Sequence, residues 1–449
     1  MTTKKLTDYI KQSISVQGTK KEEQPKPTQA RIRFKKETEL QETPIGKIPK
    51  EWKVVKLSDV AEIRGNKSIN KVNKIAFIPM ELIPDSGVFV RYEIRDLDDV
   101  SSFTYCEAGD ILLAKITPSF ENGKQGIVPD DVPNRFALTT TEVYPIACKQ
   151  VNRLFLFYIL KHPKFRKILE HSMRGTTGRR RVPRDALENL EMPIPPLSEQ
   201  KVIAEILSTV DSAIDRVRRL VERAEKLKKG LMQELLTKGI GHKEFKETPI
   251  GKIPKEWILV RASEVAKYIN GYPFSPKDWK TKGIPIIRIQ NLNNPDAEFN
   301  YFDGEIDEIY KVKNGDILLS WSGSIGVYLW NRGDAVLNQH IFKVIPKSNV
   351  DNFFLYYVLS LAVEQLKKRT HGSTMKHFRR EELRVTFITL PPLPEQQKIA
   401  EILYTVDEYI RMLEARLERL EHVKKWLMDV LLSGKVRIIV EPSSGGSSG

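Results

Sequence analysis

Two stretches of the chain carry apolar residues every three or four positions, with charged residues on the remaining faces. In the first stretch the apolar positions are Ile203, Leu207, Val210, Ile214, Val217, Val221, Ala224, Leu227, Leu231 and Leu235. In the second stretch they are Ile399, Leu403, Val406, Ile410, Leu413, Leu417, Leu420, Val423, Leu427 and Leu431. This spacing is that of a heptad seam, and it predicts two helices of about 38 residues, each roughly 55–60 Å long.

An apolar seam of this length needs a surface to pack against. Each helix could lie against its own globular region, but the seam is narrow and long, which favours packing of the two helices on each other. If two tandem units are related by an approximate two-fold axis, the helices form an antiparallel coiled coil. A homodimer through the same seams is the alternative geometry.

Both helices are expected to begin at a pair of prolines. The chain reads Pro-Pro-Leu-Ser from Pro195 and Pro-Pro-Leu-Pro from Pro391. Proline suits the first turn of a helix, Ser198 is a candidate N-cap, and Glu199 and Glu395 would lie near the positive end of the helix dipole.

The region before each helix has shorter patterns. Apolar and β-branched runs at residues 285–292 and 337–346, separated by Gly, Asn and Pro, predict strands and turns. Residues 151–169 and 352–369 predict helical stretches. We therefore predict an α+β domain with a sheet core before each long helix.

The chain repeats itself. The undecapeptide ETPIGKIPKEW occurs at residues 42–52 and again, letter for letter, at 247–257. GDILLAK at 109–115 corresponds to GDILLSW at 315–321. PPLSEQ, which begins at residue 195, corresponds to PPLPEQ, which begins at residue 391. The interval from 109 to 195 shrinks by ten residues in the second copy, from 315 to 391. A repeat of this length indicates two tandem mixed α/β domains with pseudo-two-fold symmetry.

We interpret the repeated undecapeptide as a structural joint between a helix end and a globular domain. Its glycine, proline and tryptophan suit a tight, buried elbow. The residues concerned are Gly46, Pro49 and Trp52 in the first copy and Gly251, Pro254 and Trp257 in the second.

These landmarks divide the chain into six parts. They are an N-terminal extension (1–41), a first domain (42–194), a first helix (195–238), a second domain with its linker (239–390), a second helix (391–435) and a C-terminal tail (436–449). A short helix is possible near residues 6–14, and residues 443–449 resemble a Gly/Ser linker.

The charge points to a polyanionic partner. The chain has 73 Lys and Arg against 58 Asp and Glu, a formal net charge of +15, which suits nucleic acid as a partner and a basic but inert surface equally well. Cys106 and Cys148 form no disulfide framework and no metal spacing. Without an apolar run long enough for a membrane span, we expect a cytoplasmic protein.

The common catalytic motifs are missing. We find no phosphate-binding loop, no H-E-x-x-H, no C-x-x-C and no G-x-S-x-G, and residues 320–326 (SWSGSIG) are expected to form a turn. No catalytic residue, metal site or cofactor is predicted, which makes an enzyme the weaker class.

Basic clusters occupy matched places in the two copies, each in a Gly- and Thr-containing loop before the long helix. The candidate DNA contacts in these loops are Arg174, Arg179, Arg180, Arg181 and Arg184 in the first copy, and Arg369, Lys376, His377, Arg379 and Arg380 in the second. Further candidates are Lys115, Lys124, Asn270, Tyr272 and Lys277. One such cluster alone would suit a solvated loop, but two at equivalent positions favour phosphate contacts.

The duplicated set of PIGKIPKEW, GDILL and PPLSEQ or PPLPEQ before a long helix resembles the specificity subunit of a type I restriction-modification system. The resemblance covers residues 42–435. It implies two target recognition domains on an antiparallel helix pair that spaces them, each reading one half of a bipartite DNA site. It also implies a non-catalytic subunit that binds two modification subunits, which methylate adenine with S-adenosylmethionine, and that is joined by restriction subunits.

The two domains keep their landmarks, but most residues between them differ, so we expect an asymmetric DNA target. Two other classes stay open. One is a coiled-coil scaffold or decayed specificity subunit that binds the methyltransferase without reading DNA. The other is an enzyme with an unrecognised site.

Overall fold

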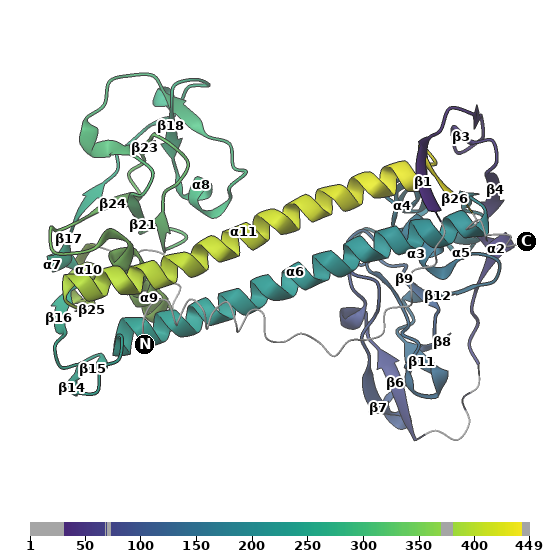
Figure 1. The fold of residues 1–449 in the computed structure, drawn as a ribbon, viewed down its shortest axis with the longest axis horizontal. Coiled ribbons are helices and arrows are strands. Elements are labelled where there is room, and N and C mark those ends of the chain that lie inside the picture. Colours follow the sequence, from purple (N-terminus) through teal and green to yellow (C-terminus); the bar gives the residue numbers. More distant parts are fainter. Residues whose placement is uncertain (1–30, 68, 70–72, 370–379, 442–449) are drawn as a thin grey trace, which may run out of the picture. The chain divides into compact units, whose positions relative to one another are not determined.

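The computed structural model describes residues 31–67, 69, 73–369 and 380–441 (Figure 1). These residues form two compact units. The first unit contains the described residues up to Arg219 together with those from Glu414 onward, and the second contains Leu220–Leu413. The expected short helix at 6–14 and the linker-like residues 443–449 lie outside the described residues.

The first unit is built on two four-stranded sheets. Its strands are β1 (Arg31–Lys36), β2 (Leu40–Gln41), β3 (Ile48–Pro49), β4 (Lys53–Lys56), β5 (Ala61–Ile63), β6 (Lys74–Ile78), β7 (Glu93–Asp96), β8 (Thr104–Glu107), β9 (Ile111–Ala114), β10 (Gln125–Ile127), β11 (Phe136–Thr139), β12 (Val143–Cys148), β13 (Glu191–Ile194) and β26 (Val436–Glu441). One sheet has the order β10-β9-β12-β5 and is antiparallel. The other has the order β7-β6-β11-β8, with β6 and β11 parallel.

The second unit repeats the topology of these two sheets. Its strands are β14 (Phe245–Thr248), β15 (Gly251–Pro254), β16 (Ile258–Arg261), β17 (Ala266–Asn270), β18 (Ile284–Ile287), β19 (Asn300–Phe302), β20 (Lys311–Val312), β21 (Ile317–Ser320), β22 (Gly326–Leu329), β23 (Ala335–Leu337), β24 (Ile341–Pro346) and β25 (Phe387–Leu390). The sheet orders are β22-β21-β24-β17 and β19-β18-β23-β20, and β18 and β23 are the parallel pair. The predicted duplicated α+β architecture is therefore confirmed.

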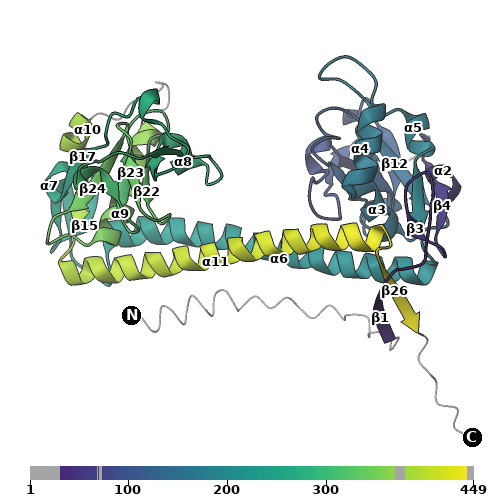
Figure 2. The ribbon, with the colours of Figure 1, turned by 90° about the horizontal axis from the view of Figure 1, so that it is seen from above.

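The helices follow the same plan. They are α2 (Leu57–Val60), α3 (Arg153–Lys161), α4 (Pro163–Ser172), α5 (Arg184–Glu188) and α6 (Leu197–Lys238), then α7 (Ala262–Val265), α8 (Ile289–Asn293), α9 (Asn352–Arg369), α10 (Arg380–Val385) and α11 (Leu393–Leu432). Each unit contains the start of one long helix beside the end of the other (Figure 1, Figure 2). In the first unit Asp211 pairs with Lys424 and Arg218 with Glu421, so the two segments run antiparallel, as predicted.

Some local predictions were wrong. The helical stretch expected over 151–169 is broken at His162, because His162 is extended and Pro163 starts α4 without an N–H to continue α3. The strand expected over 285–292 ends at Ile287 and gives way to α8. Of the run 337–346, only Leu337 and residues 341–346 are in strands, with a turn between them.

Ser198 is not a helix cap. The amide of Gln200 donates to the carbonyl of Pro196 at 3.0 Å, so the helix has already begun before Ser198. Gln396 does the same with Pro392 in α11, at 3.1 Å.

Most positions of the predicted seam are buried or half-buried, but Val423 is 46% exposed. Its neighbour Lys424 faces α6 instead, where its ammonium pairs with Asp211. The prediction of the seam considered only apolar residues. It therefore missed Lys424, which points toward α6 because the buried carboxylate of Asp211 binds its ammonium.

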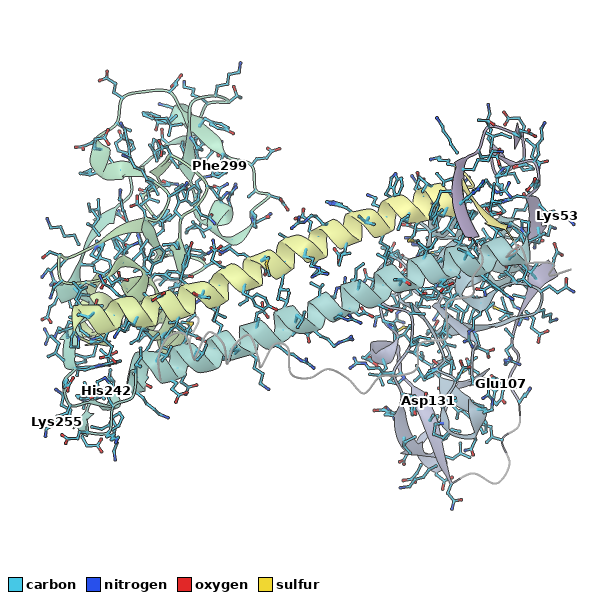
Figure 3. All side chains as sticks on the ribbon, viewed as in Figure 1. Lys53, Glu107, Asp131, His242, Lys255 and Phe299 are labelled. Carbon is cyan, nitrogen blue, oxygen red and sulfur yellow. The ribbon has the colours of Figure 1, made fainter. Side chains whose placement is uncertain are left out.

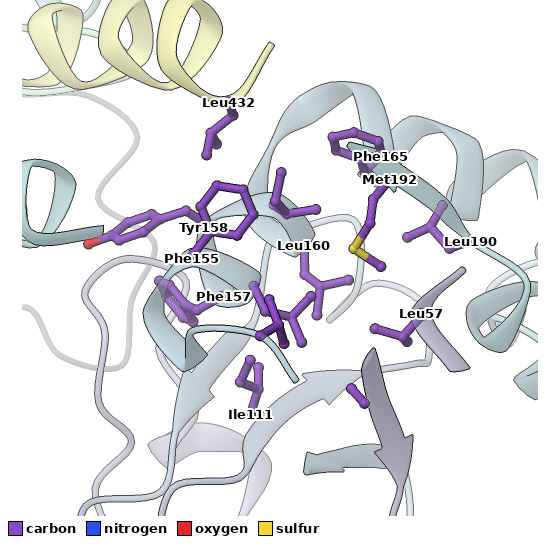
Figure 4. Packing of buried hydrophobic residues seen from close by; sticks show 14 of the residues in the cluster. Leu57, Ile111, Phe155, Phe157, Tyr158, Leu160, Phe165, Leu190, Met192 and Leu432 are labelled. Carbon is purple, nitrogen blue, oxygen red and sulfur yellow. The ribbon is translucent and has the colours of Figure 1, made fainter. Parts of the chain in front are cut away.

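The helix ends also belong to the globular cores. Figure 4 shows the large core of the first unit, where Phe155, Phe157 and Leu160 of α3 meet Ile111 of β9 and Leu432 at the end of α11. The second unit has an equivalent core with the end of α6 and the start of α11. The helices therefore pack both on each other and on the domains of each unit.

The repeated undecapeptide forms the same joint in both units. Gly434 and Gly239 end the long helices with positive φ angles, 73° and 68°, and they lie against Trp52 and Trp257, respectively. Both tryptophans are buried, and each amide donates to the proline three residues earlier at 3.0 Å. The elbow predicted from the repeat is confirmed.

A glutamate in the first turn of each long helix holds this joint. Glu199 accepts from Trp52 Nε1 at 3.1 Å, from the Ile438 amide at 2.9 Å and from Arg437 Nε at 2.9 Å. Glu395 accepts from Trp257 Nε1 at 2.9 Å and from the Ile240 amide at 3.0 Å.

The side chain that meets the glutamate at the second joint is different. His242, just beyond the end of α6 (Figure 3), lies with its Nε2 2.8 Å from Glu395, where the first joint has Arg437. The glutamate of the PPLSEQ and PPLPEQ motifs is therefore the residue that fastens helix, elbow and the segment after the other helix.

The next residue of the motif fastens the domain helix. Gln200 accepts from the amide of Asn152, the cap of α3, at 2.8 Å, and donates to the carbonyl of Pro195 at 2.9 Å. Gln396 does the same with Asp351 before α9, at 2.9 Å, and with Pro391, at 2.8 Å.

No helix among the described residues is long and apolar enough to cross a membrane.

We expect Arg437→Met to lower the free energy of unfolding by about 3–5 kcal/mol, because it leaves the buried carboxylate of Glu199 without its cation. Lys435→Met is the matched control. It removes an ion pair with Asp429 whose two side chains are 62% and 54% exposed, and we expect a loss of about 0–1 kcal/mol. Urea denaturation followed by circular dichroism measures both. Equal losses in the two variants would contradict the role given to Arg437.

Candidate nucleic-acid interface

The basic loop of the first unit is a hairpin. Arg174 and Arg181 exchange two backbone hydrogen bonds, of 2.9 and 2.8 Å. The loop is attached to the β10-β9-β12-β5 sheet, because Thr117 donates to the carbonyl of Arg180 at 2.9 Å and Val182 to that of Lys115 at 2.8 Å. Thr117 and Lys115 lie just after β9, so the hairpin is placed at one end of this sheet.

Most arginines of the hairpin are already in ion pairs. Arg181 binds Glu142 with two hydrogen bonds, of 2.9 and 2.6 Å, and holds the pKa of that carboxyl below its usual value. The other pairs are Arg174 with Asp185 at 3.6 Å, Arg180 with Glu121 at 3.4 Å, and Arg184 with Glu188 at 2.8 Å. Such solvated pairs are weak, so a phosphate can replace the carboxylate at little cost.

Arg179 differs from its neighbours. It is exposed and has no ion-pair partner within the part of the chain that the structure describes. Among the five predicted arginines, its guanidinium is therefore the one that could bind a phosphate without first breaking an ion pair.

The two lysines predicted in this domain lie in different surroundings. Lys115 follows β9, its ammonium is 4.8 Å from the centre of the Tyr144 ring, and burial lowers its pKa. Lys124 donates to the carbonyls of Met80 and Ile83 at 2.7 and 3.1 Å. The ammonium of Lys124 therefore already has two backbone acceptors, and a DNA contact from it stays a prediction.

The second unit has a different set of residues at the same end of the equivalent sheet. Ala114 pairs with Val143 in the first unit as Ser320 pairs with Ile341 in the second. Trp321 therefore takes the place of Lys115, and its amide donates to the carbonyl of His340 at 3.3 Å, as that of Lys115 does to Glu142 at 3.0 Å.

Polar and aromatic side chains gather there. Asn270 accepts from Trp321 Nε1 at 3.0 Å, and the Trp321 and His340 rings are 5.2 Å apart. His340 Nδ1 is buried and has no hydrogen-bond partner among the described residues. Asn270 was among the candidates predicted from the sequence, whereas Trp321 and His340 were not.

Tyr272 lies beside this group. Its ring is 4.9 Å from Phe274 and 5.4 Å from Tyr310. The backbone at residue 271 lies against the backbone of Asn338. Only glycine fits there, since a Cβ on Gly271 would be 2.1 Å from the carbonyl oxygen of Asn338. Lys277 is exposed in the segment that follows. The structure thus brings Asn270 and Tyr272 together with the turn before β24.

The basic loop of the second unit is only partly described. Arg369 ends α9 and Arg380 begins α10. The side chains of these two residues, and Lys376, His377 and Arg379 as a whole, lie outside the described residues. In chain order this loop matches the hairpin of the first unit, because each lies between the domain helices and the short helix before the long one.

Chemically, both sheet ends are suited to nucleic acid. Arginines bind phosphate or guanine, amides bind adenine, and exposed aromatic rings stack on bases. Among the described residues, no group of three or more His, Cys, Asp or Glu side chains is placed to hold a metal ion.

Comparison with known proteins gives the same picture. Residues 49–226 and 254–422 match the model of the type I restriction modification DNA specificity domain. The type I restriction enzyme MjaVIII specificity subunit of Methanocaldococcus jannaschii is 29% identical, over 91% of this chain and 98% of its own. A second chain of that organism, named for the MjaX specificity subunit, is 30% identical over 91% of this chain and 99% of its own.

The fold has a solved relative as well. The crystal structure of the S subunit of a type I restriction-modification system from M. genitalium matches 85% of this chain and 96% of its own, with a TM-score of 0.56 at 14% identity. The duplicated framework, the family model and the full-length relatives agree: this chain belongs to the family of type I restriction-modification specificity subunits.

Proposed function

We propose that this chain is the DNA-reading subunit of a type I restriction-modification complex, and that each unit reads one half of an asymmetric bipartite site. Specificity subunits of such systems bind DNA and work with methyltransferase and restriction subunits. The chain supplies recognition and position, and the chemistry belongs to its partners. It needs no cofactor of its own for this role.

One observation carries the proposal. The same sheet end, with the same backbone bonds, presents different side chains in the two units. The first presents Lys115, Glu142 and the arginine hairpin. The second presents Trp321, His340 and Asn270. Two frameworks that match and two surfaces that differ are what an asymmetric target requires, since equal surfaces would read equal half-sites.

The contacts divide by chemistry. The arginines of the hairpin bind phosphates and fix the position of the first unit on the duplex. In the second unit, the amide of Asn270 and the rings of Tyr272 and Trp321 meet base edges or flipped and stacked bases. The DNA sequence of each half-site follows from these side chains.

Selection from randomised duplex DNA, with this chain and its cognate modification subunits, tests the proposal. We expect two short and different blocks separated by an unread spacer of fixed length. A palindromic consensus would contradict the proposal that the two half-sites differ. A single block, or no enrichment with retained subunit binding, would favour a protein scaffold that no longer reads DNA.

Arg179→Gln tests the phosphate contacts. We expect weaker DNA binding, to the same extent for all sequences, and a slope of log K against log salt concentration that is smaller by about 1. Lys149→Gln is the matched control, because Lys149 follows the other end of β12 and pairs with Glu62. Fluorescence anisotropy at a series of salt concentrations measures both. An unchanged slope for Arg179→Gln would remove this residue from the interface.

We also propose that α11 helps to dock a modification subunit. Val423 and Trp426 are 46% and 60% exposed and three positions apart, so they lie on one face of the helix and form an apolar patch. Large exposed aromatic residues at such places are common anchors of protein interfaces.

Trp426→Ala is expected to weaken the binding of one modification subunit by about tenfold or more, within the range of anchor residues. Native mass spectrometry would show loss of the complex with two modification subunits in favour of the complex with one. Phe89→Ala removes an equally exposed aromatic side chain from the first domain, at 53% exposure, and should leave the stoichiometry unchanged. The same result for both variants would contradict the docking role.

A further inference from the structure

A buried aspartate in the first unit joins three helices. Asp211 lies on α6, accepts from the hydroxyl of Tyr158 on α3 at 2.8 Å, and pairs with the ammonium of Lys424 on α11 at 2.5 Å. Figure 4 shows the Tyr158 hydroxyl directed out of the apolar core in which its ring lies. We call these three residues the first triad.

The second unit has the same arrangement with the long helices exchanged. Asp407 lies on α11, accepts from the hydroxyl of Tyr357 on α9 at 2.6 Å, and pairs with Lys228 on α6 at 2.5 Å. We call these residues the second triad. Each triad thus connects one domain helix with both long helices of its unit.

The first triad is more sheltered from water than the second, in which the side chains of Asp407 and Lys228 are 17% and 25% exposed. The side chains of Asp211 and Lys424 are 4% and 18% exposed, and both tyrosine side chains are buried. Burial, with the neighbouring aspartate, raises the pKa of Tyr158 and of Tyr357, so both phenols remain hydrogen-bond donors. Hydrogen bonds and ion pairs in buried and half-buried places have better-defined directions than those on the surface, because fewer water molecules compete for the partners.

Each domain helix is held at two points. At its start, Gln200 binds Asn152, the cap of α3, and two turns later Asp211 binds Tyr158. In the second unit Gln396 binds Asp351, and Asp407 binds Tyr357. Two separate points on each helix determine the angle at which one crosses the other. The lysine adds a third point, which fixes how far the second long helix is shifted along the first.

Apolar packing alone does not give this precision. The hydrophobic effect has no direction, and a seam of leucine and valine permits neighbouring registers. A buried ion pair contributes little net stability compared with apolar residues, and its best-attested use is to fix register. The triads are therefore suited to set geometry more than to hold the fold together.

The surroundings support this reading. Lys161, three residues after Tyr158, donates to the carbonyls of Asp85 and Gly123, whereas Ser360, three residues after Tyr357, donates back to the carbonyl of Tyr356 in its own helix. The triads are thus alike in the two units while their neighbours differ.

We propose that the two triads are positioning residues: they fix the orientation of each recognition domain on the helix pair, and with it the length of the spacer between the half-sites. This inference rests on the proposed function, because a spacer exists only if both units read DNA. It assigns spacer length to buried side chains that touch no DNA.

Tyr158→Phe and Tyr357→Phe test the inference in the full chain with its cognate modification subunits. Both variants keep the aspartate paired with its lysine, so no unpaired charge is buried. The probes are duplexes that carry the two selected blocks with spacers of the wild-type length and of one base pair more or less. We expect the preference for the wild-type spacer to fall about fivefold, the equivalent of one hydrogen bond of about 1 kcal/mol, with the same blocks read.

Glu408→Gln is the matched control, because Glu408 pairs only with Arg411 on its own helix among the described residues. Lys424→Met should broaden the spacer preference as well, and Lys424→Arg, which keeps the ion pair, should restore it. An unchanged spacer preference in both tyrosine variants, with the blocks still read, would overturn the inference. Loss of a whole block in these variants would also overturn it, since that result indicates a folding role.

A different result would contradict the proposed function itself. If the wild-type chain selects no pair of blocks, the proposed function is wrong whatever the variants do. A wild type that selects two blocks and tyrosine variants that keep its single spacer length would leave the proposed function intact and remove only the role of the triads.

Discussion

The structure depends on a carboxylate placed in the first turn of each long helix. Glu199 and Glu395 each accept an indole N–H from the repeated elbow and a backbone N–H from the segment beyond the end of the other helix. One side chain thus ties together three parts of the chain that are far apart in sequence, 147 residues in the case of Trp52 and Glu199. A further side chain completes each site, Arg437 in one unit and His242 in the other.

Polar bonds and apolar packing have separate tasks in each unit. The apolar clusters bring the domain, the start of one helix and the end of the other into a single core. The glutamate, the glutamine after it and the aspartate of each triad then fix directions within that core. All of these polar residues lie on the long helices, whereas the side chains that we propose to contact DNA lie at one end of a sheet. Those side chains can therefore change without disturbing the bonds that hold the domain.

Much of this architecture could be predicted from the sequence because it is local or repeated. The heptad spacing predicts both long helices, and the two copies of ETPIGKIPKEW predict a joint made twice. The break at Pro163 has a local cause and could have been predicted from the sequence. The partners of Glu199 and Asp211 could not be predicted, because their contacts are formed by segments distant in sequence. Val423 was misplaced for that reason, since the inward turn of Lys424 depends on Asp211.

Trp321 and His340 were missed because their position follows from strand register, although an alignment of GDILLAK with GDILLSW puts Trp321 opposite Lys115.

Neither copy of the repeat completes a unit by itself. Each globular domain is fastened at the start of the helix that follows it and at the end of the helix from the other copy. A half-length chain with one domain and one helix would have a domain without its second helix and a helix end without its elbow. Two identical half-length chains would supply both missing parts to each other. The framework therefore fits an origin by gene duplication from such a self-complementary half, after which the two reading surfaces were free to diverge.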